Sequence, residues 1–198
     1  MGRALWYMFA FAAALSLACG GRRETAAPAG NAAAKPAAKQ AGGTQASAPA
    51  TGETTVGSMM PAYSAKSLDG KPFDLAGEHG QVVLLNLWAT WCAPCRFEIP
   101  QLQKMSDQYA GRGFKVIGVS LDDTGADGVR AFVNEHKMTY PIVLDSEGKL
   151  ANMLQTSSIP TTLLIDREGK IVWRQLGPIA EGDPELKAAL EKALIEKV

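Results

Sequence analysis

Two cysteines, Cys92 and Cys95, stand three positions apart in the segment TWCAPCRFEIP, residues 90–100. Such a pair can form a structural disulfide, bind a metal or exchange bonds with the disulfides of other proteins. A structural disulfide here closes a very short loop, for which the loop-entropy model gives about 2 kcal/mol, against about 4.7 kcal/mol for a loop of about 100 residues. A purely structural bridge is therefore the weaker interpretation.

Metal binding lacks ligands in this sequence. A zinc site commonly takes a second cysteine pair or two nearby histidines. Beyond the pair, the chain has one more cysteine, Cys19, and two histidines, His79 and His136, which are far apart in sequence. We therefore expect no metal and no cofactor, and only a copper relay that uses the two thiols alone stays open.

Thiol-disulfide exchange fits both the spacing and the place of the pair. Residues three apart on a helix are neighbours on its surface, so a disulfide can form and open there with little backbone movement. At a helix start, unpaired N–H groups and the helix dipole stabilise an anion, which makes Cys92 the expected attacking thiolate. Cys95, one turn deeper, is then the thiol that resolves the mixed disulfide. Pro94 has no backbone N–H and suits the first turn of such a helix.

The segments around the pair alternate between strand and helix. The near-continuous apolar run QVVLLNLWA (81–89) predicts a strand buried on both faces, and a helix is expected from about Pro94 to Tyr109. Before them, residues 63–75 predict a hairpin with an Asp-Gly turn. After them, FKVIGVSL (114–121) predicts a second buried strand.

The second half of the sequence continues this alternation and ends with a hairpin and a helix. Two apolar stripes with helical spacing mark helices, and the last helix is expected to begin at Asp183 with Pro184 at its first position. The stripes consist of Val129, Phe132, Val133 and His136, and of Leu186, Leu190 and Leu194. The other expected segments are a strand at 140–145, a short helix at 150–154 and a hairpin of strands at 161–166 and 170–176.

Parallel strands linked by helices and completed by an antiparallel pair predict an α/β fold, a mixed central sheet flanked by helices, with an N-terminal β-hairpin extension. The chain has 198 residues, of which 46% are hydrophobic and 20% are charged, and this suits one well-buried core. Its formal net charge is zero at pH 7. No overall field attracts nucleic acid, so we expect no nucleic-acid partner, and we expect a monomer.

The first residues predict an export signal. In residues 1–18, Arg3 precedes an uninterrupted apolar run, and small residues lead up to Cys19. The apolar run is shorter than the ~20 residues needed to cross a bilayer, so a cleaved signal peptide is favoured over an uncleaved anchor. The segment LSLAC resembles the lipobox of bacterial lipoproteins, which implies lipidation of Cys19, while a simple cleaved signal stays an alternative.

Residues 19–57 predict a lipid-anchored flexible linker. From Gly21 to Gly57 the segment is rich in Ala, Gly, Pro, Lys, Gln and Thr, and Val56 is its only large aliphatic residue. Such a segment cannot bury enough apolar surface to offset the entropy of ordering it. The folded domain is therefore expected over residues 58–198.

The segment NLWATWCAPCRFEIPQL resembles the active-site segment of thioredoxin-like proteins, and specifically of the membrane-tethered TlpA/ResA/DsbE group. The resemblance extends through FKVIGVSLDD, YPIVLD and IPTTLLIDREGKIV and covers about residues 60–195. It implies a thioredoxin-like fold and a redox disulfide between Cys92 and Cys95. It further implies an exported oxidoreductase that faces the periplasm or extracytoplasmic space, takes client proteins as partners and is served by a thiol donor in the membrane.

The resemblance also assigns residues around the pair. It implies that Trp91 is the indole beside the nucleophile, that Pro100 kinks the helix and that Pro160 is a cis proline facing the cysteines. The exposed backbone before Pro160 would pair with an extended client segment, strand against strand. The residues expected to contact the client are Trp91, Ala93, Pro94, Ile159 and Thr161.

Two polar residues near the pair bear on proton transfer. Asn86 stands six residues before Cys92, where ordinary thioredoxins have a buried aspartate that assists proton transfer to the resolving thiol. Asparagine cannot titrate, and Glu98, one turn after Cys95, could take over part of that role. Alternatively, Glu98 is only an acidic side chain near a helix start, stabilised by the helix dipole. Both interpretations stay open.

The favoured function is reduction of disulfides in particular client proteins. A general oxidant stays open because 30 mV of potential equals only about 1.4 kcal/mol for this two-electron couple, a difference that Ala93 and Pro94 do not resolve. A thiol peroxidase is less favoured, because peroxiredoxins resemble one another in a threonine three residues before the reactive cysteine, where Ala89 stands here. Haem ligation in cytochrome c maturation is open but not favoured, because Thr161 rather than an acidic residue follows Pro160.

Overall fold

The computed structural model describes residues 54–196. The expected signal peptide, Cys19 and the linker up to residue 53 lie outside the described residues, as do residues 197 and 198. Within the described range, no helix combines the length and the apolar character needed to span a membrane.

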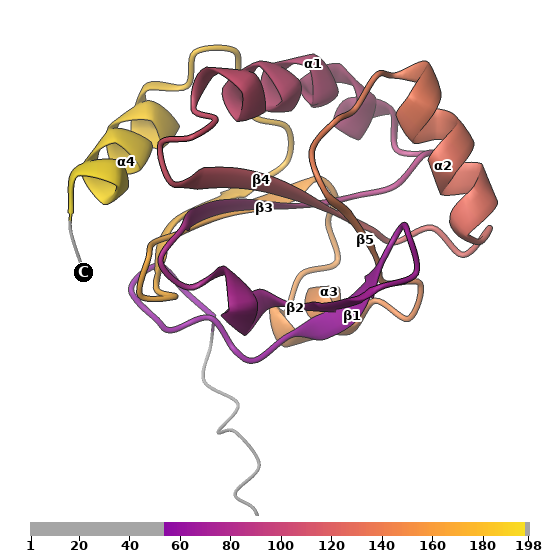
Figure 1. Cartoon of the computed structure of the whole chain (residues 1–198), viewed down its shortest axis with the longest axis horizontal. Helices are drawn as coiled ribbons and strands as arrows, with labels where there is room; N and C mark the ends of the chain where they lie inside the picture. Colours follow the sequence, from indigo (N-terminus) through magenta and orange to yellow (C-terminus); the bar gives the residue numbers. More distant parts are fainter. Residues whose placement is uncertain (1–53, 197–198) are drawn as a thin grey trace, which may run out of the picture. The chain divides into compact units, whose positions relative to one another are not determined.

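Strands and helices follow one another along the domain as the sequence pattern predicts (Figure 1). The N-terminal hairpin, the central strands, the second hairpin and the last helix all occupy the expected segments. The strands are β1 (Ser64–Ser67), β2 (Pro72–Asp74), β3 (Val82–Trp88), β4 (Phe114–Ser120), β5 (Ile142–Leu144), β6 (Thr161–Ile165) and β7 (Ile171–Leu176). The helices are the 3-10 helix η1 (Leu75–Glu78), α1 (Ala93–Gln108), α2 (Ala126–Glu135), α3 (Lys149–Met153) and α4 (Pro184–Ile195).

The strands form one seven-stranded sheet in the order β2-β1-β5-β4-β3-β6-β7. β3, β4 and β5 run parallel, and the other strands pair antiparallel with their neighbours. The predicted mixed sheet with a hairpin extension is therefore confirmed. Because β3 and β4 are parallel neighbours, their carboxyl ends meet at one edge of the sheet, where Trp88 lies opposite Ser120. The cysteine pair and the start of α1 follow directly after this edge.

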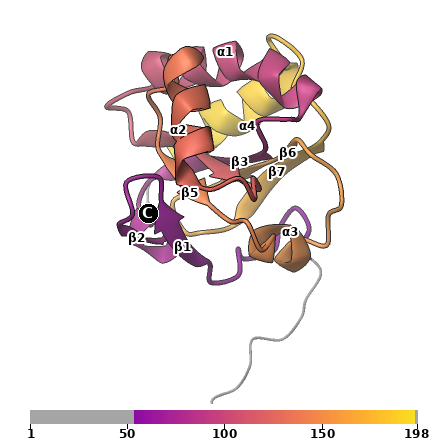
Figure 2. The same cartoon turned by 90° about the vertical axis from the view of Figure 1, so that its right-hand side faces the viewer.

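Helices cover both faces of the sheet. α1, α2 and α4 pack on one face, and α3 and η1 lie on the other (Figures 1 and 2). Successive residues of β3 point to opposite faces, so Leu84 belongs to the first core and Leu85 to the second. All seven residues of β3 are buried. The strand that leads to the cysteine pair is thus held from both sides, as its apolar run predicts.

The folded domain begins before the boundary expected at residue 58. The Thr54 side chain is only 5% exposed, and its hydroxyl donates to the carbonyl of Met153 at 3.1 Å. The Thr54 carbonyl accepts a hydrogen bond from the guanidinium of Arg174 at 2.6 Å. Composition places these residues in the linker because it registers apolar side chains, whereas these contacts use a hydroxyl and backbone groups.

The segment after Thr54 runs along β7 like a short extra strand. The N–H of Gly57 donates to the carbonyl of Ile171 at 2.8 Å, and the N–H of Ile171 donates to the carbonyl of Ser58 at 2.9 Å. Met59 and Lys170 form an isolated antiparallel bridge. The N-terminal segment of the domain is therefore hydrogen-bonded to the start of β7, the outer strand of the sheet.

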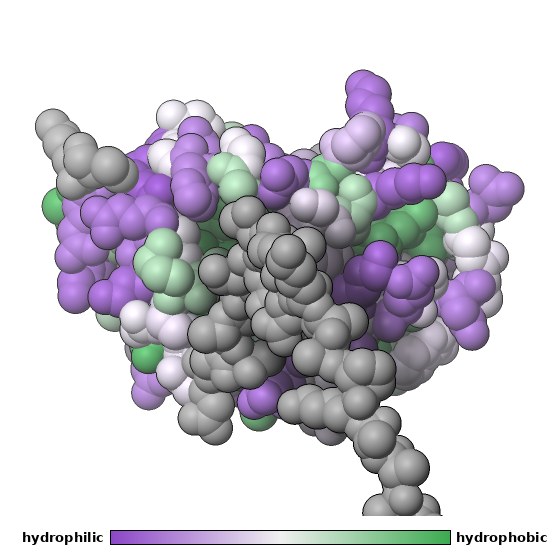
Figure 3. All heavy atoms as spheres, turned by 90° about the horizontal axis from the view of Figure 1, so that it is seen from below, coloured by the Kyte–Doolittle hydropathy of each residue, from purple (hydrophilic) through white to green (hydrophobic). Residues whose placement is uncertain are grey.

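The lower face of the domain is mixed in character. In the part that Figure 3 colours, hydrophilic side chains are interspersed with small hydrophobic patches, and no broad apolar surface is visible there. This agrees with the charge balance of the sequence, in which 20 Lys and Arg residues are matched by 20 Asp and Glu residues.

Candidate active site

A disulfide joins Cys92 and Cys95 at the first turn of α1. Their Cα atoms are 5.3 Å apart, a usual separation for bonded cysteines. Cys92 is the N-cap residue of the helix, and its Sγ accepts a hydrogen bond from the N–H of Cys95 at 3.2 Å. The helix start thus offers one of its unpaired amides, that of Cys95, to this sulfur, as the sequence predicts.

The rim of the disulfide is exposed and largely apolar. The Trp91 side chain is 66% exposed, and Ala93 and Pro94 are also exposed. Phe97, farther along the first turns of α1, is 84% exposed. Sequence reasoning did not single it out, although an aromatic residue so close to a reactive pair is a usable signal. Cys92 itself is only 5% exposed, so a partner must approach it over this rim.

The loop before β6 holds the predicted proline. The peptide bond between Ile159 and Pro160 is cis, as the resemblance implies. Pro160 is buried, and its carbonyl accepts a hydrogen bond from the N–H of Gly177 at 2.8 Å, which ties the loop to the end of β7. Ile159 is half-buried, and within residues 54–196 its backbone N–H and carbonyl take part in no hydrogen bond.

Thr161 lies inside the domain and not on the rim. Its side chain is 0% exposed, and its hydroxyl donates to the carbonyl of Ser158 at 2.6 Å and lies 3.1 Å from the hydroxyl of Thr156. Thr161 is the first residue of β6, and its buried hydroxyl stabilises the preceding loop through these contacts. The expected contact between the Thr161 side chain and a client does not fit this placement.

Glu98 is buried one turn after Cys95, with 2% of its surface exposed. Its Oε1 accepts a hydrogen bond from Nδ2 of Asn86 at 2.7 Å, and its Oε2 accepts one from the N–H of Ile179 at 3.0 Å. Burial raises the pKa of this carboxyl above its usual value, although the two hydrogen bonds oppose the rise. The carboxyl is therefore held inside the site by Asn86 and Ile179 and does not face solvent. A buried carboxyl with a raised pKa is suited to take up a proton.

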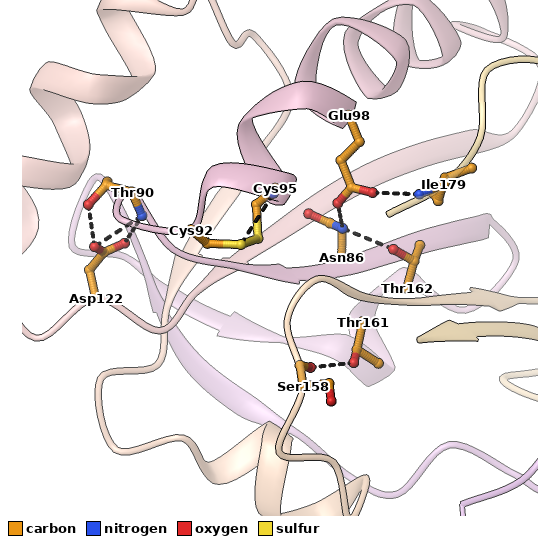
Figure 4. Close-up of a disulfide and its surroundings, with 10 residues drawn as sticks. All are labelled: Asn86, Thr90, Cys92, Cys95, Glu98, Asp122, Ser158, Thr161, Thr162 and Ile179. Atoms are coloured by element: carbon orange, nitrogen blue, oxygen red, sulfur yellow. Dashed lines mark hydrogen bonds between the residues drawn. A yellow bond between two sulfur atoms is a disulfide. The ribbon is translucent and has the colours of Figure 1, made fainter. Parts of the chain in front are cut away.

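Asn86 connects Glu98 to the sheet. It lies in β3 opposite Thr162 of β6, and its Nδ2 donates to the Thr162 hydroxyl at 2.9 Å as well as to Glu98 (Figure 4). An amide does not titrate in the ordinary range of pH. On this side of the disulfide, Glu98 is therefore the group that can exchange a proton.

A second buried carboxylate, Asp122, lies on the other side of the disulfide (Figure 4). It follows the end of β4 and accepts hydrogen bonds from Thr90, which stands two residues before Cys92. Sequence reasoning missed it, yet a signal exists. An acidic residue two positions after the end of a strand parallel to β3 reaches the same edge of the sheet as the cysteine pair.

Known proteins resemble this chain in sequence and in fold. The family described as Redoxin matches residues 55–190. The thioredoxin-like protein YneN of Bacillus subtilis is 36% identical over 139 residues, which cover 68% of this chain and 79% of that protein. The thiol-disulfide oxidoreductase ResA of Bacillus thuringiensis is 32% identical over 122 residues, covering 62% of this chain and 70% of that protein. A secreted thiol-disulfide isomerase of Corynebacterium glutamicum has a similar crystal structure, with a TM-score of 0.63 and 27% identity over 69% of this chain and 86% of that one.

The matched region contains the whole sheet and the cysteine pair, since residues 55–190 run from before β1 into α4. The names of the relatives and the geometry around the disulfide agree on one chemistry, the exchange of a disulfide with a protein partner. The chain belongs to the Redoxin family and is a thioredoxin-like thiol-disulfide oxidoreductase.

Proposed function

We propose that this oxidoreductase reduces the disulfides of particular client proteins outside the cytoplasm, while its N-terminus holds it at a membrane. The observation that supports the chemistry most strongly is the bonded pair at the start of α1, in which the sulfur of Cys92 receives an amide hydrogen bond of 3.2 Å. The same arrangement suits both redox states of the pair. It favours a thiolate in the reduced protein and closes readily into a disulfide in the oxidised one.

The charges near the pair favour reduction over oxidation. A strong oxidant needs a thiolate that is stabilised in its reduced form, often by a neighbouring cation. Among residues 54–196, the buried charged residues are all acidic: Glu98, Asp122 and Asp145. Without a buried cation to stabilise the thiolate, the disulfide form is favoured, and the reduced protein tends to pass its electrons on.

The first half of the reaction breaks the client disulfide. The Cys92 thiolate attacks one sulfur of the client, the bond between the two client sulfurs breaks, and the second client sulfur leaves as a thiolate that takes a proton from solvent. The product is a mixed disulfide between Cys92 and the client. Cys92 is assigned this step because it caps α1 and lies nearest the exposed rim.

The second half releases the client. The Cys95 thiol gives its proton to the carboxylate of Glu98, its sulfur attacks the sulfur of Cys92, and the remaining client sulfur leaves and is protonated. The client has gained two electrons and two protons, and the protein is left with the Cys92–Cys95 disulfide of the described structure. A dithiol donor in the membrane then restores the reduced pair. The raised pKa of Glu98, caused by its burial, suits this proton transfer.

The client is proposed to lie across the apolar rim. Trp91 and Phe97 expose 66% and 84% of their surface near the disulfide, and Leu176, at the end of β7, exposes 55%. Ala93 and Pro94 present no bulky or charged side chain between the cysteines. The unpaired backbone groups of Ile159 can accept an extended client segment, because a strand pairs through its main chain.

Removal of single cysteines tests the assigned steps. Cys92→Ala is expected to abolish the reduction of a disulfide-containing protein substrate, and Cys95→Ala is expected to trap clients as mixed disulfides on Cys92. Undiminished activity of Cys92→Ala would refute the assignment. A reduction potential above roughly −150 mV, measured against glutathione, would instead assign the protein as an oxidant.

The proposed location depends on the N-terminus. Residues 1–18 are proposed as a signal peptide, Cys19 as the lipidated residue and the following residues as a spacer between membrane and domain. The secreted isomerase of Corynebacterium glutamicum supports an extracytoplasmic role. Cell fractionation tests this proposal: Cys19→Ser should move the protein from the membrane fraction to the soluble fraction. Full retention of the variant in the membrane would point to an uncleaved anchor.

A further inference from the structure

Asp122 lies close to the reactive pair because β3 and β4 are parallel neighbours. Trp88 is paired with Ser120, and the N–H of Leu121 donates to the carbonyl of Trp88 at 2.9 Å. This bond carries the pairing one residue beyond β4 and brings Asp122 to the turn that leads from β3 to the disulfide.

The carboxylate of Asp122 is held by neutral donors only. The N–H of Thr90 donates to Oδ1 at 3.1 Å and to Oδ2 at 3.0 Å, and the Thr90 hydroxyl donates to Oδ1 at 2.5 Å. The Ser120 hydroxyl donates to Oδ2 at 2.7 Å. None of the ion pairs found within residues 54–196 includes Asp122. Both oxygens accept hydrogen bonds, and none of these neutral donors cancels the negative charge of the carboxylate.

This charge is near Cys92 and poorly screened. Thr90 and Cys92 belong to one tight turn, which the N–H of Cys92 closes by donating to the carbonyl of Ala89 at 3.1 Å. Two residues of chain cannot separate the carboxylate from the sulfur by much more than roughly 10 Å. Asp122 and Cys92 are 3% and 5% exposed, so solvent and salt weaken their interaction less than at the surface.

The other charged groups around the pair do not cancel this field. On α1, Arg96 is exposed to solvent and Glu98 is acidic, and Asp123, beside Asp122, is exposed and acidic as well. A negative charge disfavours a thiolate but has little effect on a disulfide, which carries no charge. Asp122 therefore acts against the helix-start amides, which favour the thiolate.

We propose that Asp122 is a positioning residue that acts through its charge: it opposes the Cys92 thiolate and so shifts the Cys92–Cys95 couple toward the disulfide, which makes the reduced protein a stronger reductant. The electron balance is that of the proposed function, on which this inference rests, with two electrons and two protons passing to the client. Asp122 shifts the equilibrium of disulfide exchange toward the reduced client, and it does not contact the client itself.

Asp122→Asn tests this proposal because it removes the charge and keeps the shape of the side chain. The equilibrium of the Cys92–Cys95 pair with glutathione is expected to shift about threefold or more toward the dithiol, which corresponds to about half a unit of thiol pKa. In the Cys95→Ala background, the pH midpoint of Cys92 alkylation is expected to fall by about half a unit.

Thr90→Val is the matched control, since it removes one hydrogen bond from the same carboxylate and leaves the charge in place. It should not lower the alkylation midpoint or shift the glutathione equilibrium toward the dithiol. Equal shifts in Asp122→Asn and Thr90→Val would show a structural role and overturn the proposal, as would no shift in Asp122→Asn. Should Asp122→Asn fail to fold by near-ultraviolet circular dichroism, Asp122→Ser removes the same charge and answers the same question.

The outcome is separable from that of the proposed function. If the unmodified protein reduces no client disulfide, the proposed function fails, while the alkylation midpoints still decide what Asp122 does to Cys92. If the protein reduces clients and Asp122→Asn leaves the midpoint and the glutathione equilibrium unchanged, only the inference on Asp122 fails.

Discussion

The two buried carboxylates that flank the disulfide differ in how they are held. Glu98 accepts one hydrogen bond at each oxygen, from Asn86 and from the backbone of Ile179. Asp122 accepts four, from the N–H and hydroxyl of Thr90 and from the hydroxyl of Ser120. The two side chains are almost equally hidden, at 2% and 3% exposure. Their chemistry therefore depends on the donors around them and not on burial alone.

The difference in donors separates two tasks within one site. With only two donors, desolvation outweighs the hydrogen bonds and raises the pKa of Glu98, which prepares it to receive a proton. Around Asp122, the N–H and hydroxyl of Thr90 and the hydroxyl of Ser120 hold the carboxylate in place through four contacts. This contrast supports the two proposed roles, proton transfer at Glu98 and a fixed charge at Asp122.

The largest expected effect comes from removing the proton acceptor. Glu98→Gln keeps the size of the side chain and one acceptor oxygen, yet it cannot take the proton of Cys95. The resolution of the mixed disulfide should slow about 100-fold, within the usual range for general acid-base catalysis, while the attack by Cys92 keeps its rate. Rapid-mixing kinetics that separate the two steps provide the measurement. Equal slowing of both steps would show that Glu98 has no special task in resolution.

Asn86→Ala should destabilise the part of the site around Glu98, because it removes a hydrogen-bond donor. The Nδ2 group serves Glu98 and the Thr162 hydroxyl, so its loss leaves two buried acceptors without their partner. The free energy of unfolding is expected to fall by about 3 kcal/mol in urea denaturation. Thr162→Val, which removes only one of the two acceptors, should cost clearly less. A stability equal to that of the unmodified protein would show that water replaces the amide.

Stability should decrease with rising pH because of Glu98. The folded-state pKa of this carboxyl is raised above its usual value of 4.5. Below the unfolded pKa the full stability is present, and it is lost as the pH rises through the folded pKa, since the buried group then ionises. Each unit between the two pKa values corresponds to about 1.4 kcal/mol. Urea denaturation of the oxidised protein between about pH 4 and pH 8 should show this fall, and Glu98→Gln should flatten it.

The smallest expected effect is on the Asp122 side. Ser120→Ala removes one donor to the carboxylate and the acceptor of the Asp122 N–H, and it leaves the two groups of Thr90 in place. The free energy of unfolding should fall by about 1 kcal/mol, and the rate of disulfide exchange should stay the same. A loss as large as that of Asn86→Ala would mean that the network around Asp122 is cooperative and not a sum of separate bonds.

Much of the fold and the centre of the site can be predicted from the sequence. The burial of β3, the helix that starts after Cys92 and the hairpin ahead of β3 follow from apolar periodicity and turn residues, which act locally. The bonded cysteine pair follows from its spacing at a helix start. The peptide bond before Pro160 required the resemblance, because a loop proline alone does not specify its isomer.

The features that were missed depend on contacts between distant segments. Asp122 gains its importance from its place beside Thr90, which only the pairing of β3 with β4 creates. The burial of Glu98 depends on its face of α1, which it shares with the buried residues Cys95 and Leu102. His136 ends α2 as its C-cap residue and stacks on Phe132 at 3.9 Å instead of continuing the apolar stripe within the helix.

The segment that runs beside β7 also affects how copies of the domain meet. A bare outer strand invites pairing with the sheet of another molecule, and this is a common route to aggregation. Here, Gly57 and Ser58 already occupy the N–H and carbonyl of Ile171. At the opposite border, β2 is only Pro72–Asp74 and starts with a proline, which has no N–H to donate. Within residues 54–196, the start of β7 and the short β2 are therefore poor templates for a strand of another molecule, which lowers the risk of aggregation through these two places.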